Sequence, residues 1–272
     1  MLVIMIVSFM HELCYAMAYG SARLALASLQ LTIHSWSVSL VMGIGYPALS
    51  PSATCQQPLD VSNDFTFKVI DGILSDFSKV FKFKFVHLGG DEVNTSCWTT
   101  TPRIKTWLLQ HGMNESDAYR YFVLRAQQIA IKHGYDIINW EETFNNFGDK
   151  LDRKTVVHNW LGGGVAEQVV SAGLRCIVSN QDKWYLDHLD ALWQGFYMNE
   201  PWTNIYNPEQ RKLILGGERL WTPLEKLAKD PSTVTARLAR FRCLLNERGV
   251  AAAPLAGYGR TTPSEPDSCI RQ

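Results

Sequence analysis

From residue 62 onward, the apolar positions alternate between the spacing of a helix face and the short continuous runs of buried strands. Phe65, Val69, Ile73 and Phe77 recur at the spacing of one helix face, and the apolar run at 82–88 then predicts a strand. The alternation continues, predicting strands at 135–140, 155–160, 174–179 and 213–217, and helices from Asn114 to Gly134, at 165–172 and at 232–247. A long aromatic loop is expected to run up to Asn207. Strands that alternate with helices are typical of an α/β fold with a parallel sheet.

The first 42 residues do not fit this alternation. Only Glu12 and Arg23 carry charge before residue 42, and the chain opens with the apolar run 2–7. No basic segment precedes this run, as a secretory signal normally requires, and the run is too short to span a membrane. Three interpretations of residues 1–42 stay open: a poor secretory signal, a remnant of a strand, or sequence unrelated to the rest of the chain.

Composition excludes several classes of protein. With 272 residues, 46% hydrophobic, the chain can bury a large core as one domain. The formal net charge is zero, so nothing indicates a nucleic-acid partner. The six cysteines form no Cys-x-x-Cys pair, and His11-Glu12 lacks a second histidine four positions later. We therefore expect neither a metal nor another cofactor.

The candidate chemistry begins where the strand at 82–88 ends. Gly89 and Gly90 follow this strand, and two adjacent carboxylates, Asp91 and Glu92, come next. Within a regular strand, neighbouring side chains point to opposite faces and could not share a site. Glycines at the carboxyl end permit a bend, so both acids can turn into one cleft, where parallel α/β folds keep their chemistry. The alternative is an acidic pair that merely opens a surface loop.

Five motifs resemble those of one enzyme family. The run from His87 to Glu92, followed by Val93 and Trp98, resembles the acidic signature of the β-N-acetylhexosaminidases, family 20 of the glycoside hydrolases, and most closely the plant enzymes. The other four motifs stand in the family's order at 138–142, 157–160, 183–187 and 218–221. The resemblance identifies residues 43–272 as an incomplete TIM-barrel catalytic domain, with the fourth to eighth of the eight strands recognisable.

The resemblance also implies a mechanism and its residues. The family hydrolyses terminal non-reducing N-acetylhexosamines from glycans by substrate-assisted, retaining catalysis. Glu92 matches the general acid/base, and Asp91 matches the residue that holds the acetamido N–H. The matching substrate-binding residues are the aromatic walls Trp140 and Trp160, the acetamido-carbonyl ligand Tyr185 and the hydroxyl ligand Asp187. His87 either supports the acidic pair or is a satisfied core histidine, and a tryptophan that ends a buried strand often only packs.

Two alternatives compete with this reading. If the family reading fails, Glu141 or Glu142 would serve as a conventional nucleophile opposite Glu92. The second alternative is an inactive truncated product or a weak glycan-binding remnant. It rests on the first three strands and the family's Trp-Gly-Glu loop, which have no recognisable counterpart; the loop would follow Gly217. An open half barrel would expose sheet edges that the complete fold covers.

The cysteines and the glycosylation sequons indicate where in the cell the protein is expected. The resemblance implies the disulfides Cys55–Cys97 and Cys243–Cys269, while Cys176 lies in an apolar strand as an expected buried thiol. Asn94 and Asn114 begin glycosylation sequons, and Asn114 is favoured because Asn94 lies so near Glu92. Together these features indicate the secretory pathway, with a vacuolar/lysosomal or extracellular destination. The expected partners are glycans that end in N-acetylglucosamine or N-acetylgalactosamine, and a homodimer stays open.

Overall fold

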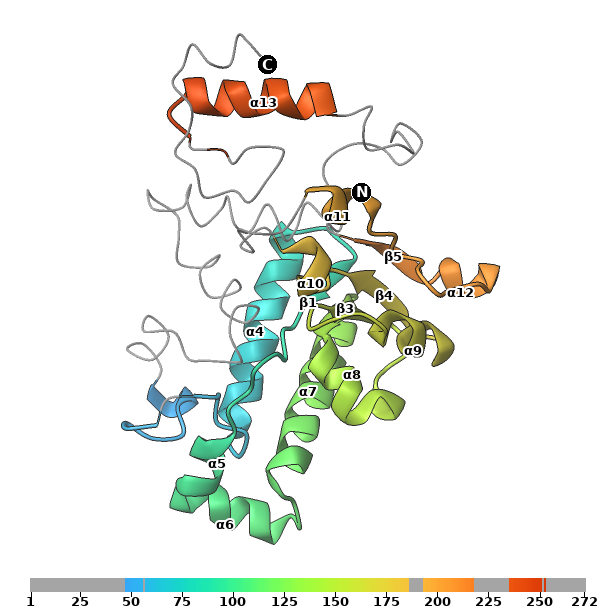
Figure 1. The fold of residues 1–272 in the computed structure, drawn as a ribbon. Coiled ribbons are helices and arrows are strands. Elements are labelled where there is room, and N and C mark those ends of the chain that lie inside the picture. Colours follow the sequence, from blue (N-terminus) through green and yellow to red (C-terminus); the bar gives the residue numbers. More distant parts are fainter. Residues whose placement is uncertain (1–46, 56, 186–192, 218–234, 251, 253–272) are drawn as a thin grey trace.

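A parallel sheet forms the centre of the molecule in the computed structural model, which describes residues 47–55, 57–185, 193–217, 235–250 and 252 (Figure 1). Its five strands are all parallel and follow one another in chain order across the sheet. They are β1 (Phe85–His87), β2 (Asp136–Trp140), β3 (Thr155–Asn159), β4 (Arg175–Val178) and β5 (Ile214–Gly217). This confirms the predicted α/β class and the partial barrel, because the described strands form an open sheet rather than a closed ring.

Two long helices, α4 (Asp64–Val80) and α7 (Glu115–Lys132), pack against each other and cover one face of the sheet. Asn63 caps α4 by accepting a hydrogen bond from the backbone N–H of Phe65. At α7, Asn114 and Asp117 form a reciprocal capping box, and the cap confirms the predicted helix start. The helices that follow later strands are α8 (Glu141–Phe147), η3 (Gly148–Lys150), α9 (Val165–Ser171) and α13 (Thr235–Glu247).

Several short helices were not predicted from the apolar pattern. The connection after β1 contains α5 (Ser96–Thr100) and α6 (Pro102–Gln110). The expected aromatic loop instead contains α10 (Gln181–Trp184) and α11 (Trp193–Met198), and the short helices η2 (Pro47–Leu49) and α12 (Pro208–Arg211) complete the described elements. The strand predicted at 82–88 is also shorter, because only its residues 85–87 pair with β2.

Alternation along the strands divides the buried side chains into two clusters. Ile137 on β2 and Val157 on β3 join the main core with α4 and α7. Ile138, Val156 and Ile177 form a second cluster on the opposite face, against which Phe85 packs. Burial of both faces is the usual condition of a parallel sheet, and it leaves the strand ends as the polar regions.

Of the covalent features, the disulfide Cys55–Cys97 is present and ties the segment before α4 to α5. Cys176 is fully buried on β4, as expected, and burial raises the pKa of its thiol. Cys243 lies on α13, and its expected partner Cys269 lies outside the described residues, so that pairing stays a prediction.

Candidate active site

The two candidate acids follow a sharp backbone bend at the carboxyl end of β1. Gly89 and Gly90 adopt φ values of 71° and 107°, and Glu92 itself has a φ of 44°. The bend leaves Asp91 half-buried, with one carboxylate oxygen buried, and Glu92 exposed. Glu92 makes no hydrogen bond or ion pair with other described residues. The predicted turn after the glycine pair is therefore present, and it gives the two acids different environments.

Neighbouring elements hold this bend from two sides. The Tyr119 hydroxyl on α7 donates to the Gly90 carbonyl at 2.5 Å, and Asn139 Nδ2 on β2 donates to the Gly89 carbonyl at 2.9 Å. Gly90 also has no room for a side chain, because a Cβ there would lie 2.7 Å from Cγ2 of Thr143. The bend is thus fixed by packing as well as by glycine's freedom to adopt positive φ.

A third carboxylate, Glu142, lies near Asp91, the first of the two adjacent acids. Burial raises its pKa, and the charges of Asp91 and Glu141 raise it further, against the opposing effect of a hydrogen bond from Trp160. Burial likewise raises the pKa of the Tyr119 hydroxyl, and the charges of Glu142 and Asp91 add to that shift. Burial together with nearby like charges therefore favours retention of a proton on Glu142.

Three aromatic rings form a wall beside these acids. Trp140 ends β2, Trp160 follows β3, and Tyr185 follows α10. The Trp140 and Trp160 centroids are 6.3 Å apart with their planes at 69°, whereas Trp160 and Tyr185 lie 6.5 Å apart and nearly parallel. We call Asp91, Glu92 and Glu142 the acidic cluster. Trp160 Nε1 donates to the Glu142 carboxylate at 3.0 and 3.1 Å, so the wall is joined to this cluster. We call Trp140, Trp160 and Tyr185 the aromatic wall.

A chain of buried histidines supports the wall from within the sheet. The Gly89 N–H donates to His87 Nδ1 at 3.0 Å, which places the His87 proton on Nε2, 3.3 Å from His158 Nδ1. His158 Nε2 then faces the Ser179 hydroxyl at 2.8 Å, and the His158 ring stacks on Trp140 with centroids 4.2 Å apart. Burial lowers the pKa of His87 to about 3, and burial followed by the nearby His87 lowers the pKa of His158 well below its usual value. His87 is therefore a neutral core histidine that also holds the bend before the acids.

Glu141 has a different place from Glu142. It is 1% exposed and accepts hydrogen bonds from Asn159 Nδ2, from the Trp160 N–H at 2.7 Å and from the Leu161 N–H at 3.2 Å. Through these bonds, the Glu141 carboxylate stabilises the loop after β3. Its geometry disfavours the alternative in which Glu141 acts as a nucleophile.

The structure links Asp91, Trp140, Trp160 and Tyr185 through Glu142 and the ring contacts, whereas Glu92 lies exposed at the bend beside Asp91. Asp187 lies outside the described residues, so its position stays a prediction. Sequence reasoning assigned no role to Tyr119, Asn139 or His158, which hold the bend and the wall. A signal existed for the last two, since each is a polar side chain that directly follows two apolar residues within a strand. Within the described ranges, no group of three histidine, cysteine or acidic residues could hold a metal ion.

A parallel sheet whose strands end in acids and stacked aromatic rings defines an enzyme of the α/β-barrel class, since such barrels carry their chemistry at this face. The chain belongs to glycosyl hydrolase family 20: the model of that family's catalytic domain matches residues 48–226. The predicted family is confirmed.

Known relatives agree with this assignment. The chain is 64% identical over 260 residues to beta-hexosaminidase 3 of Arabidopsis thaliana. This match covers 86% of the chain and 49% of that relative. It is 47% identical over 259 residues to beta-hexosaminidase 1 of the same plant, covering 85% of the chain and 48% of that relative. The chain therefore spans about half the length of these curated relatives.

The fold also resembles a solved member of the family. The structure of the exo-β-N-acetylglucosaminidase from Vibrio harveyi in complex with N-acetylglucosamine matches with a TM-score of 0.61 at 21% identity, over 75% of this chain and 38% of that one. This likeness supports the barrel-type fold of the described sheet.

Proposed function

We propose that this chain is the acid-bearing part of a β-N-acetylhexosaminidase that removes terminal N-acetylglucosamine or N-acetylgalactosamine from glycans. The observation that carries the proposal is the junction of the acidic cluster with the aromatic wall, made by the bond from Trp160 to Glu142. A sugar ring offers apolar C–H faces to aromatic rings and hydroxyls to carboxylates, so both halves of this edge suit one ligand.

In the proposed reaction, the oxygen of the sugar's own 2-acetamido group attacks the anomeric carbon, and the bond to the departing oxygen breaks. Glu92 gives its proton to that oxygen and later takes one from the attacking water. Its exposure at the bend leaves it accessible to a glycosidic oxygen that arrives from solvent. Half-buried Asp91 accepts the acetamido N–H and offsets the positive charge that develops on the cyclic intermediate.

The aromatic wall would confine the acetamido group in this scheme. Trp140 and Trp160 pack around the methyl group, and the Tyr185 hydroxyl donates to the acetamido carbonyl. Support comes from the 6–7 Å spacing of the rings, which keeps them at one site. The buried Trp140 indole N–H has no hydrogen-bond partner among the described residues, and it supplies a further donor at this edge.

A pair of aryl glycosides tests this proposal. The protein should cleave an aryl 2-acetamido-2-deoxyglucoside and leave the matching glucoside intact, because glucose lacks the internal nucleophile. Glu92→Gln should lower the rate by about 10²–10⁴-fold through loss of proton transfer. Glu209→Gln is the matched control, since it removes an exposed carboxylate of α12. Equal cleavage of both glycosides would favour a conventional two-carboxylate glycosidase instead.

A second candidate is a glycan-binding chain without turnover. It is favoured by the described sheet, in which β1 and β5 each pair along one side only. Such edges expose unpaired backbone groups and favour association or unfolding. A cooperative thermal melt combined with robust turnover would exclude this candidate, whereas sugar binding without cleavage would support it.

We also propose that the chain passes through the secretory pathway toward a vacuolar/lysosomal or extracellular destination. The disulfide Cys55–Cys97 supports this route because such bonds persist in oxidising compartments. The sequon residues Asn94 and Asn114 are both exposed, and Asn114 caps α7 through Oδ1, so its Nδ2 is available for a glycan. None of the described helices has the length and hydropathy to cross a bilayer. A mass increase of the secreted protein that is lost in Asn114→Gln would test the preferred sequon.

A further inference from the structure

A hollow of about 890 Å³ lies between the segment 47–53, the start of α4 and helix α6. None of its lining residues belongs to the acidic cluster or the aromatic wall. Figure 1 places this segment beside α5 and α6, at the end of α4 where that helix begins. The volume falls within the range of small-ligand sites, so the hollow is large enough for one or two sugar rings.

The lining is polar but carries almost no net charge. Hydroxyl and amide groups come from Ser50, Ser62, Asn63, Thr106 and Gln110. The one ionisable side chain among its described lining residues is that of Arg103, which is ion-paired with the fully buried Asp60. Because this carboxylate offsets the guanidinium charge, the hollow should not attract anions. The Ser62 and Thr106 hydroxyls donate within the chain and keep acceptor lone pairs, while the Gln110 amide is the neutral group most open to a ligand.

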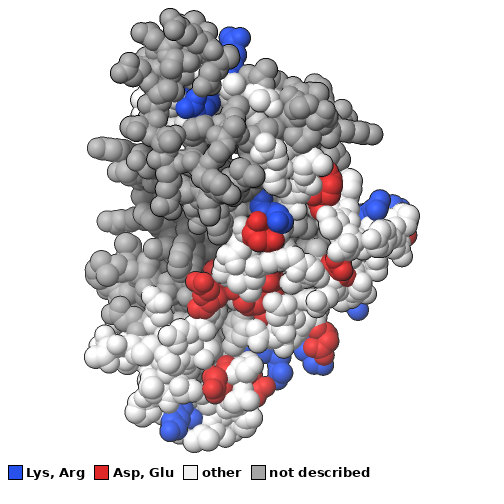
Figure 2. Space-filling model, in the orientation of Figure 1, with Lys and Arg blue, Asp and Glu red and all other residues white. Residues whose placement is uncertain are grey.

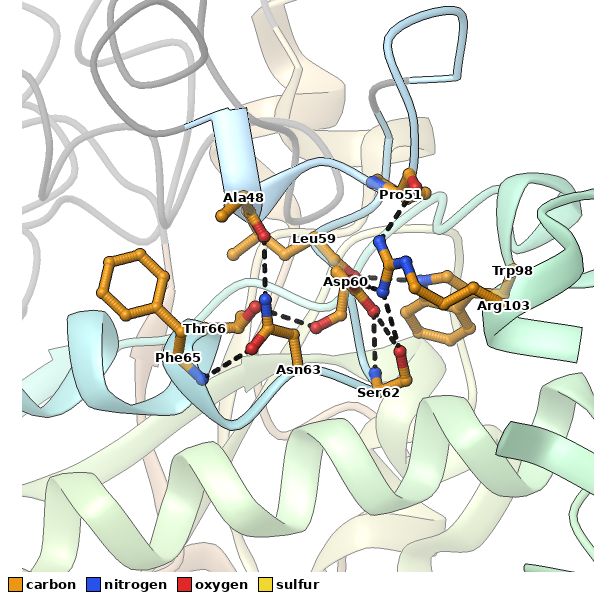
Figure 3. A network of polar contacts seen from close by, with 10 residues as sticks. All are labelled: Ala48, Pro51, Leu59, Asp60, Ser62, Asn63, Phe65, Thr66, Trp98 and Arg103. Atoms are coloured by element: carbon orange, nitrogen blue, oxygen red, sulfur yellow. Dashed lines mark hydrogen bonds and ion pairs between the residues drawn. The ribbon is translucent and has the colours of Figure 1, made fainter. Parts of the chain in front are cut away.

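The lining is held in place before any ligand arrives (Figure 3). Asp60 Oδ1 accepts from both the backbone N–H and the hydroxyl of Ser62, at 2.9 and 2.7 Å. Arg103 Nη2 donates to the Pro51 carbonyl at 3.0 Å, and Asn63 Nδ2 donates to the Ala48 carbonyl at 3.1 Å. Trp98 Nε1 donates to the Leu59 carbonyl at 2.9 Å, next to the disulfide at Cys97. A rigid lining loses little entropy on binding, which favours recognition of a weakly interacting ligand.

Apolar surfaces complete the lining. The half-buried Trp107 ring and the rings of Pro47 and Pro51 border the hollow. Tyr121 and His111 fix the Trp107 ring, with centroids 5.7 and 4.3 Å away. Aromatic and proline faces together with uncharged hydrogen-bonding groups match a pyranose, which has an apolar face and a rim of hydroxyls.

We propose that this hollow is a second carbohydrate-binding site, which takes an uncharged sugar unit of a glycan. It would bind independently of the acidic cluster and aromatic wall, which together we call the catalytic edge. The acetamido group is not required, since the lining holds no enclosed aromatic pocket comparable to the wall. The site would keep a branched glycan attached while its ends are presented to the catalytic edge.

Titration with mannotriose and cellotriose, followed by saturation-transfer NMR on the whole chain, tests the proposal. Both probes are uncharged and lack acetamido groups, so the catalytic edge is not expected to select them. We expect saturable binding of at least one probe with a Kd of about 1 mM. Thr106→Gln adds bulk inside the hollow from an exposed position and should weaken binding by about fivefold or more.

Lys105→Gln is the matched control, because this neighbouring residue is exposed on α6 and does not line the hollow. It should leave the Kd unchanged, as should Trp160→Phe in the aromatic wall. Absence of saturable binding by both probes would overturn the proposal, as would equal binding by wild type and Thr106→Gln. Tighter binding of N-acetylneuraminic acid than of the neutral probes would also overturn it, since the hollow would then select anions. These outcomes do not depend on turnover, so they are separable from failure of the proposed function.

Discussion

Glu142 joins the acids to the aromatic wall, because both of its carboxylate oxygens lie within 3.1 Å of Trp160 Nε1. Its environment raises its pKa above the ordinary value of 4.5, chiefly through burial. The carboxylate therefore has two effects: it orients one ring, and it adds negative charge beside Asp91.

A fluorescence titration tests this position. Ionisation of Glu142 should change Trp160 emission with a midpoint above pH 4.5, because the folded protein disfavours the charged form. Glu142→Gln keeps an acceptor for the indole N–H but cannot ionise, so this transition should disappear. The exposed-site variant Glu209→Gln should retain it. A transition that persists in Glu142→Gln would show that another group causes it.

Gly90 offers a second prediction at the scale of a single residue. Its φ of 107° and the 2.7 Å approach of a Cβ to Thr143 Cγ2 make any side chain unfavourable. We expect Gly90→Ala to lower the free energy of unfolding by about 1–3 kcal/mol. Gly72→Ala is the control, since Gly72 lies within α4 with open space around it and should gain about 0.5–1 kcal/mol. Urea denaturation measures both, and equal effects would contradict the account.

The sequence predicted the candidate residues at the strand ends, but not the residues whose hydrogen bonds fix their positions. Asp91, Trp140 and Trp160 could be found because each lies at or just beyond the carboxyl end of an apolar run. Tyr119 and Asn139 bond to the glycine bend across 29 and 50 positions of sequence, and such distant pairs leave no local pattern.

At the scale of elements, β1, β3 and β4 are joined by buried polar side chains inside an apolar sheet. His87 lies on β1, His158 lies on β3, and Ser179 directly follows β4. His87 contacts His158, and His158 contacts Ser179, so the three side chains connect these strands. Both histidines are buried and neutral, so their protonation is linked to unfolding.

This linkage predicts loss of stability in mild acid. The folded pKa of His87 is about 3, below the ordinary 6.5, and that of His158 is also depressed. The unfolded chain therefore binds more protons as the pH falls below 6.5, and each histidine should remove about 1.4 kcal/mol per pH unit. Glu142 has the opposite sign, since its raised pKa favours the folded state as pH falls toward 4.5.

Urea denaturation between pH 6.5 and 4.5 measures the slope. The depressed pKa values of the Asp71 and Asp136 carboxyls affect stability mainly below this window, so the histidines dominate it. A free energy of unfolding that is flat across the window would contradict the buried, neutral state of the histidine pair.

Long helices and buried strands were predictable because their apolar periods extend over many residues, as in α4 and α7. The two helices after β1 were not, because they are short and begin at local signals. Asn94 Oδ1 accepts the Ser96 N–H just before α5, and Pro102 is the first residue of α6. Such local signals indicate a turn, but they do not show whether a short helix or a loop follows it.

At the scale of the whole molecule, the partial barrel that the resemblance implied agrees with the observed sheet. Consecutive parallel strands separated by helices allow few topologies, and the sheet follows the simplest of them. On the face shown in Figure 2, the described acidic and basic side chains lie interspersed, in keeping with a net charge of zero. Residues 1–42, Asp187 and the junction after Gly217 lie outside the described residues, so the expectations for them stay predictions.

We expect the acids and aromatic rings at the strand ends to recognise a 2-acetamido sugar. Calorimetric titration with N-acetylglucosamine and with glucose tests it directly, whether or not the chain turns over substrate. The Kd should be at least about tenfold lower for N-acetylglucosamine, a difference of about 1.4 kcal/mol, and Trp160→Ala should abolish that preference. Equal affinities for the two sugars, or a preference that survives Trp160→Ala, would contradict it.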